Sequence, residues 1–99
     1  MVAGGEPADG FNATIHGPHR LRICALLHPV VEAEFAALRA ALEVSDSVLS
    51  KQITVLVDAG YVTQRRAVRD TRQRVWLRLT PEGRTAYEGH VAALRAIVG

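Results

Sequence analysis

The sequence has little of what marks secreted, membrane-spanning or disulfide-rich proteins. Its single cysteine, Cys24, cannot form an intramolecular disulfide, which excludes a small domain held together by such bonds. No apolar run approaches the roughly 20 residues that span a bilayer. Residues 1–10 carry acidic side chains and no apolar core, so they do not have the pattern of a signal peptide. We therefore expect a cytoplasmic protein with no membrane partner.

The sequence also lacks the residue sets that enzymes need. No nucleophile–base pair, pair of carboxylates or glycine-rich phosphate loop is recognisable. Cys24 and His28 have the spacing of metal ligands on one helix face, but a metal site needs three or four ligands and there is no second cysteine. A buried thiol beside a histidine at a helix end is the simpler interpretation, and redox sensing by Cys24 across a dimer stays open. We expect no enzymatic activity, no cofactor and no metal.

Length and composition favour one globular domain. A chain of 99 residues is too short to divide into several domains, and 48% hydrophobic with 22% charged residues is ordinary for a folded protein. Residues 1–10 contain mainly glycine, alanine, proline and acidic residues, which predicts a flexible N-terminal tail. Residues 11–99 are then the folded domain, with Phe11 and Ile15 as candidate anchors at its start.

Lysine is nearly absent from the sequence, and most of the arginines lie in one short segment. Lys51 is the only lysine among twelve basic residues. Residues 61–84 contain seven arginines and two acidic residues, a net charge of +5, whereas the rest of the chain carries −3. Such a concentration of positive charge marks a candidate polyanion binder. From charge alone, a solvated arginine-rich hairpin without a ligand is an equally good interpretation.

Helix breakers and periodicity predict three helices in the first 60 residues. A helix over 18–28 begins at a proline and ends before another. A second helix is predicted over 32–42, with acidic residues in its first turn. Ser45 or Asp46 caps a third helix that runs to about residue 59, where Gly60 ends it.

The pattern changes to strands after the third helix. Residues 61–63 and 75–79 have the character of strands, and the second alternates clearly. The charged segment 65–73 between them predicts a hairpin arm with a mobile loop whose tip lies near residues 69–71. Thr80 and the proline after it begin a last helix that extends to about residue 98.

The predicted order is helix, helix, helix, strand, strand, helix. Two short helices joined by a short turn and followed by a basic hairpin are typical of a winged helix-turn-helix. We therefore expect a mainly α fold with a small β-hairpin wing.

The third helix has an apolar face and a polar face. Leu49, Ile53 and Leu56 can pack on the second helix, and the opposite face suits a helix in the major groove of DNA, since hydroxyls and lysine bond phosphates or base edges. The candidate DNA-binding residues of this helix are Ser47, Val48, Ser50, Lys51, Gln52 and Thr54. Two roles stay open: Val48 contacts a thymine methyl group or a neighbouring segment, and Gln52 reads a base or pairs with the second helix.

The arginine-rich hairpin complements this helix, because it can follow the DNA backbone or enter the minor groove. The candidate wing residues are Arg65, Arg66, Arg69, Thr71, Arg72 and Arg74. Outside the hairpin, Arg84 has an alternative role in a salt bridge with Glu88, four residues further along the same helix.

The last helix carries an apolar row that one small domain cannot cover completely. With a residue of the first helix, this row is the predicted dimer interface: Leu21, Tyr87, Val91, Leu94 and Val98. Packing of the row against the subunit's own core is the alternative.

Two segments together resemble a known family. SDSVLSKQITVLVDAGYV (45–62) and RLTPEGRTAY (78–87) look like the small winged-helix transcriptional regulators of the MarR and ArsR groups, over about residues 18–95. The resemblance implies a homodimeric DNA-binding regulator that places Ser47, Ser50, Lys51 and Thr54 on the recognition helix. Two departures stand out. Glu43 occupies a turn position that is commonly glycine, so we expect that turn to differ locally, and the wing contains no glycine.

These features predict a sequence-specific transcriptional regulator. The expected form is a homodimeric repressor that binds double-stranded DNA at a pseudo-palindromic operator. The alternative is a winged-helix module that binds a protein and no DNA, since fold does not fix function. A small-molecule effector is not identified by the sequence.

Overall fold

The computed structural model of the chain describes residues 10–99, so the predicted tail, apart from Gly10, lies outside the described residues. Four helices and a three-stranded antiparallel sheet make up the fold, and the predicted winged helix-turn-helix is confirmed. The elements are α1 (Pro18–Leu27), β1 (Ala33–Glu34), α2 (Phe35–Leu42), α3 (Asp46–Asp58), β2 (Val62–Arg69), β3 (Arg72–Leu79) and α4 (Pro81–Val98).

The helix ends follow the local signals of the sequence. The Ser45 hydroxyl accepts the Val48 amide at 3.2 Å and caps α3, as the Thr80 hydroxyl accepts the Gly83 amide at 2.8 Å and caps α4. Gly60 follows α3 with φ +82°, a conformation that favours glycine. These boundaries are confirmed because each depends on side chains within a few residues of the helix end.

The start of the second helix was predicted three residues too early. Ala33 and Glu34 form the short strand β1, which pairs with Leu77 and Trp76 of β3 in the sheet order β1-β3-β2. Glu34 is extended (φ −76°, ψ 141°), so α2 begins at Phe35. The open edge of β3 gives these residues hydrogen-bond partners, and this tertiary pairing overrides their local preference for helix.

The turn between α2 and α3 does not avoid the left-handed conformation, contrary to our expectation. Glu43 adopts φ 56° and ψ 47° at the end of α2, the conformation that glycine supplies more easily. For a residue with a side chain this costs about 1–2 kcal/mol. The helix-turn-helix geometry is therefore preserved at the expense of local backbone strain.

The core lies between α1, α2, α3 and the base of the sheet. Leu49, Ile53 and Leu56 of α3 are buried and belong to one apolar cluster with Leu38 and Leu42 of α2, as the helix periodicity predicts. Ile15 is fully buried in the same cluster, and Phe11 is half-buried. Both therefore anchor the chain before α1.

The hairpin is more regular than the sequence pattern indicated. Strands β2 and β3 pair continuously from Val62–Leu79 to Arg69–Arg72, so the segment expected to be a mobile loop is a two-stranded ribbon. The predicted tip is confirmed, since Asp70 and Thr71 alone connect the strands, both with positive φ (52° and 63°). This is the backbone geometry of a tight hairpin turn, achieved without glycine.

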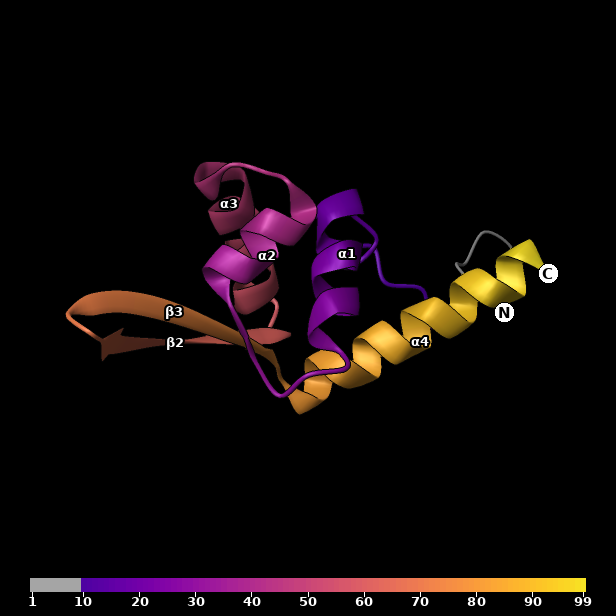
Figure 1. Cartoon of the computed structure of the whole chain (residues 1–99). Helices are drawn as coiled ribbons and strands as arrows, with labels where there is room; N and C mark the ends of the chain where they lie inside the picture. Colours follow the sequence, from indigo (N-terminus) through magenta and orange to yellow (C-terminus); the bar gives the residue numbers. More distant parts are fainter. Residues whose placement is uncertain (1–9) are drawn as a thin grey trace.

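The wing and α4 extend from the core in opposite directions (Figure 1), which gives the molecule dimensions of 56 × 25 × 22 Å. At the base of α4, the Thr80 amide donates to the Tyr61 carbonyl oxygen at 3.0 Å. Gly83 lies so close to the Tyr61 backbone, just before β2, that a Cβ atom at position 83 would be 2.0 Å from the Tyr61 carbonyl oxygen. Only glycine fits, so the start of α4 is held directly against the start of β2.

Candidate nucleic-acid interface

The polar face of α3 is exposed along its length. Ser47, Ser50, Lys51 and Thr54 are all exposed, and Val48 is 37% exposed. The Thr54 hydroxyl donates to the Ser50 carbonyl oxygen at 2.9 Å, which orients its lone pairs outward. The structure thus presents these predicted residues together on one surface.

Gln52 lies at the edge of this surface and has an internal partner. Its Oε1 accepts from Arg20 Nη1 of α1 at 2.7 Å, whereas the sequence suggested a partner on the second helix. Arg20 also donates to the Thr14 carbonyl oxygen. Gln52 therefore ties α3 to α1 and to the segment before it.

A groove of about 350 Å³ separates α3 from the wing and joins residues from both. Ser50, Thr54 and Asp58 line it from α3, and Gln64 and Arg66 line it from β2. Gln64 was not among the residues predicted from the sequence. Its position two residues from Arg66 in an alternating strand is the signal that places both on one face.

The wing has two different faces because neighbouring strand residues point to opposite sides. The strand register places Arg66 and Gln64 on the inner face, toward α3, with Val75 and Leu77 opposite them. The outer face collects the remaining arginines of the ribbon in cross-strand proximity. They are Arg65, Arg69, Arg72, Arg74 and Arg78.

Two arginines of the outer face are neutralised by the chain itself. Arg65 Nη2 lies 2.7 Å from Glu32 Oε1, and Arg74 Nη1 lies 2.6 Å from Glu34 Oε2. The Arg65 guanidinium also lies 5.8 Å from the ring centroid of Trp76. In residues 10–99 no ion pair involves Arg66, Arg69 or Arg72. Within residues 10–99, the five predicted wing arginines thus divide into two that brace the wing and three without an ion pair, which an external anion can reach.

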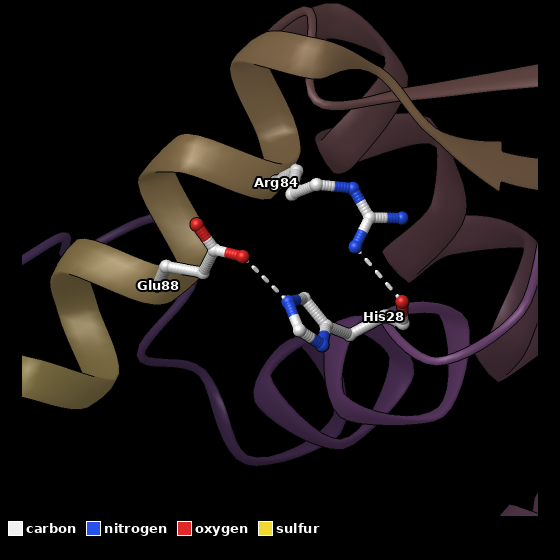
Figure 2. Close-up of polar contacts among 3 residues, drawn as sticks. All are labelled: His28, Arg84 and Glu88. Carbon is white, nitrogen blue, oxygen red and sulfur yellow. Dashed lines mark hydrogen bonds and ion pairs between the residues drawn. The ribbon is translucent and has the colours of Figure 1, made fainter.

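The alternative role considered for Arg84, a salt bridge with Glu88, is not found among residues 10–99. Arg84 Nη1 donates to the His28 carbonyl oxygen at 2.9 Å, and Glu88 Oε2 lies 2.8 Å from His28 Nε2 (Figure 2). Both side chains thus bind the end of α1, where a cation near the last carbonyl groups is favourable. They fasten α4 to α1.

The side of α4 that faces the core is not its row of large apolar residues. Gly83, His90 and Ala93 are the buried residues of α4. Tyr87 and Leu21 are half-buried and touch the core, Val91 and Leu94 are half-buried, and Val98 is 84% exposed. The predicted dimer row is therefore largely left on the outside. The sequence signal for the buried side of α4 is the series of small residues that recur three and four positions apart on either side of His90.

Cys24 is fully buried, and burial raises the pKa of its thiol to about 11. No group of three metal-ligating side chains occurs in the part of the chain that the structure describes. Nor does residue range 10–99 contain a helix that is both long and apolar enough to cross a membrane.

Comparison with known proteins identifies the fold family. The family model described as a winged helix DNA-binding domain matches residues 19–98. The chain belongs to this family. The suspected resemblance to small winged-helix transcriptional regulators is thereby confirmed.

Relatives of this winged helix include an uncharacterised protein, MJ0432, of Methanocaldococcus jannaschii, 27% identical over 82% of this chain and 84% of that protein. A transcriptional regulator homologue from Pyrococcus horikoshii OT3 has a TM-score of 0.81 and 26% identity, covering 86% of this chain and 84% of that one. The transcriptional repressor BigR from Xylella fastidiosa has a TM-score of 0.66 and 27% identity, covering 87% and 80%.

Proposed function

We propose that this winged helix is a homodimeric transcriptional repressor that binds a pseudo-palindromic operator, with α3 in the major groove and the wing on the adjacent backbone or minor groove. The groove shared by α3 and β2 carries the proposal. It joins hydroxyls of Ser50 and Thr54, which can bond base edges, to the Arg66 guanidinium, which can bond a phosphate.

The distribution of free cations supports contact with DNA on two sides of this groove. Lys51 is exposed on α3, and Arg69 and Arg72 flank the wing tip without ion pairs in the described chain. Cations on α3 and at the wing tip suit a DNA backbone that passes from the major groove to the next minor groove. Each phosphate contact should add about 0.9 to the slope of log affinity against log salt.

The proposed dimer uses the apolar row of α4, which the subunit's own core covers only in part. Tyr87 and Val91 border a shallow groove of about 320 Å³ beside this row, and Leu94 and Val98 continue it toward the end of the helix. Burying such a row against a second copy would remove apolar area from water. Two recognition helices about one DNA turn apart would then match half-sites about 10 bp apart. Repression is supported by the likeness to BigR, which is described as a transcriptional repressor.

A DNA titration tests the proposal directly. Fluorescence anisotropy at moderate salt should show that DNA from upstream of the protein's own gene binds about 10³-fold or more tightly than shuffled DNA of the same length. Equal affinity for both DNAs would refute sequence-specific regulation. Salt-insensitive binding to a protein, with no DNA binding at all, would favour an interaction module instead.

Two substitutions separate reading of bases from contact with the backbone. We expect Lys51→Ala to change the preference among operator variants, and Arg72→Ala to weaken binding to all sequences alike. Arg22→Ala is the matched control, because Arg22 is exposed on α1, outside α3, the wing and the apolar row of α4. Equal weakening of every sequence by both changes would contradict the assignment of α3 as the recognition helix.

A further inference from the structure

A pair of histidines fastens the segment before α1 to the middle of α4. His90 is completely buried, and its Nε2 lies 3.1 Å from Nδ1 of His16. On its other side, His90 Nδ1 accepts the backbone amide of Asn12 at 2.9 Å. Figure 1 shows this segment running from α4 to the start of α1. The two imidazoles thus connect parts of the chain that are more than 70 residues apart.

The segment is fitted closely around this pair. The Asn12 side chain donates to the Tyr61 hydroxyl at 2.9 Å and accepts the Ile15 amide at 3.0 Å. The Phe11 ring centroid lies 4.9 Å from the centroids of both imidazoles. A Cβ atom at Gly10 would be 2.7 Å from the Gly89 carbonyl oxygen, so the two backbones are in contact.

The hydrogen bonds determine where the protons are. Because the Asn12 amide must donate, His90 Nδ1 carries no proton, and a neutral His90 therefore has its proton on Nε2. That N–H donates to His16 Nδ1, which must likewise be unprotonated. Both histidines are neutral in this arrangement, and every hydrogen-bond position between them is used.

One additional proton cannot be accommodated without loss of a bond. A proton on His16 Nδ1 would face the His90 Nε2–H, and a proton on His90 Nδ1 would face the Asn12 N–H. Moving the His90 proton from Nε2 to Nδ1 relieves the first conflict and creates the second. Proton uptake by either ring therefore removes one hydrogen bond that holds the segment.

We propose that the His16–His90 pair is a pH-sensitive fastening that releases residues 10–16 from α4 when it takes up a proton. His16 is the titratable group that acts on His90 from the segment, and the Tyr61 hydroxyl reaches the pair through Asn12. In residues 10–99 no carboxylate hydrogen-bonds to either imidazole, and Arg20 of α1 donates elsewhere. Among residues 10–99, no carboxylate therefore pairs with the protonated form to stabilise it in place.

The direction of the pH effect follows from proton linkage. Burial and, secondarily, the neighbouring His16 lower the pKa of His90 below its ordinary value of 6.5. A released segment has solvated histidines that bind protons below about pH 6.5. Docking is therefore complete above that pH and weakens as the pH falls, by up to about tenfold per pH unit for each proton taken up. The inference depends on this local geometry and not on DNA binding.

Amide hydrogen exchange of the full chain, followed by NMR between pH 8 and pH 5, tests the fastening. After correction for the intrinsic exchange rate, protection of the Asn12 amide should fall below about pH 6.5, while that of Ile23 in α1 stays constant. Long-range nitrogen–proton spectra at pH 8 should show the His90 proton on Nε2. Constant Asn12 protection, or a proton on Nδ1, would overturn the proposal.

Two variants connect the effect to the pair. His16→Asn retains an acceptor oxygen but does not titrate, and His16 is exposed, so the fold should tolerate it. We expect it to change the pH slope of Asn12 protection, because the partner of the His90 Nε2–H can no longer take up a proton. His28→Asn removes a histidine at the end of α1 and should leave that slope unchanged. An unchanged slope in His16→Asn, or an altered slope in His28→Asn, would refute the role of the pair.

Discussion

The wing and the outer part of α4 both extend from the core, yet their surfaces have opposite chemistry. The wing carries arginines on both faces, whereas α4 exposes apolar residues, with Ile97 59% and Val98 84% exposed. Solvated cations attract a polyanion, and an exposed apolar row gains free energy only against another apolar surface. The two extensions are therefore suited to different kinds of partner.

The two extensions are also held to the core by different means. Ion pairs with Glu32 and Glu34 brace the wing from its outer face. Helix α4 is instead fixed by direct backbone contact at Gly83 near its start and by the buried His90 in its middle. Ion pairs at the surface contribute little and are screened by salt, whereas close backbone packing allows no substitute side chain.

The largest expected effect is at the base of α4. Gly83→Ala places a methyl group 2.0 Å from the Tyr61 carbonyl oxygen, so the free energy of unfolding should fall by at least about 2–3 kcal/mol in urea titrations followed by circular dichroism. Gly89→Ala is the matched control, because its Cβ would be no closer than 3.7 Å to its nearest neighbour, and it should stabilise α4 by up to about 1 kcal/mol. Equal effects would show that the backbone contact does not position α4.

The next effect concerns the apolar row. Leu94→Glu should disrupt the proposed dimer, because burial of a leucine side chain is worth about 1.5–3 kcal/mol. The dimer dissociation constant measured by sedimentation should therefore rise at least tenfold. Ala96→Glu adds the same charge at an exposed position outside the row and should leave the dimer intact. Loss of the dimer in both variants would point to charge rather than to the row.

A smaller effect distinguishes the two wing faces. Arg65 and Arg66 are adjacent but point to opposite sides, and in the described part of the chain only Arg65 has an acidic partner. Arg66→Ala should reduce the salt slope of DNA binding by about 0.9 for each phosphate that is no longer neutralised, and Arg65→Ala should reduce it by less than half as much. Equal slopes in anisotropy titrations at several salt concentrations would contradict the division of the wing into two faces.

The smallest effect is at the turn before α3. Glu43→Gly relieves the left-handed strain but frees the unfolded backbone, so we expect a net gain of about 0.5–1 kcal/mol in thermal or urea unfolding. Ala37→Gly, at an exposed position in α2 without positive φ, should instead lose about 1 kcal/mol. Destabilisation by Glu43→Gly would mean that the glutamate side chain contributes an interaction that outweighs the strain.

The sequence by itself determined the order of the helices, the cap at Thr80, the buried face of α3 and the position of the hairpin tip, and it narrowed the cap of α3 to Ser45 or Asp46. Each of these depends on residues within one or two turns of one another, so local propensity and periodicity suffice to predict them. The exposed face of α3 follows in the same way, since it is the complement of the buried face.

Only the tertiary structure decided which residues from distant segments meet. Strand β1 exists because β3 offers it an edge, and this pairing brings Glu32 and Glu34 to arginines 33 and 40 residues away. Burial of His90, rather than of the larger apolar residues of α4, follows from the close approach of Gly10 and Gly83 to neighbouring backbone. Contacts of this kind depend on how elements pack in three dimensions, and no short segment of the sequence encodes them.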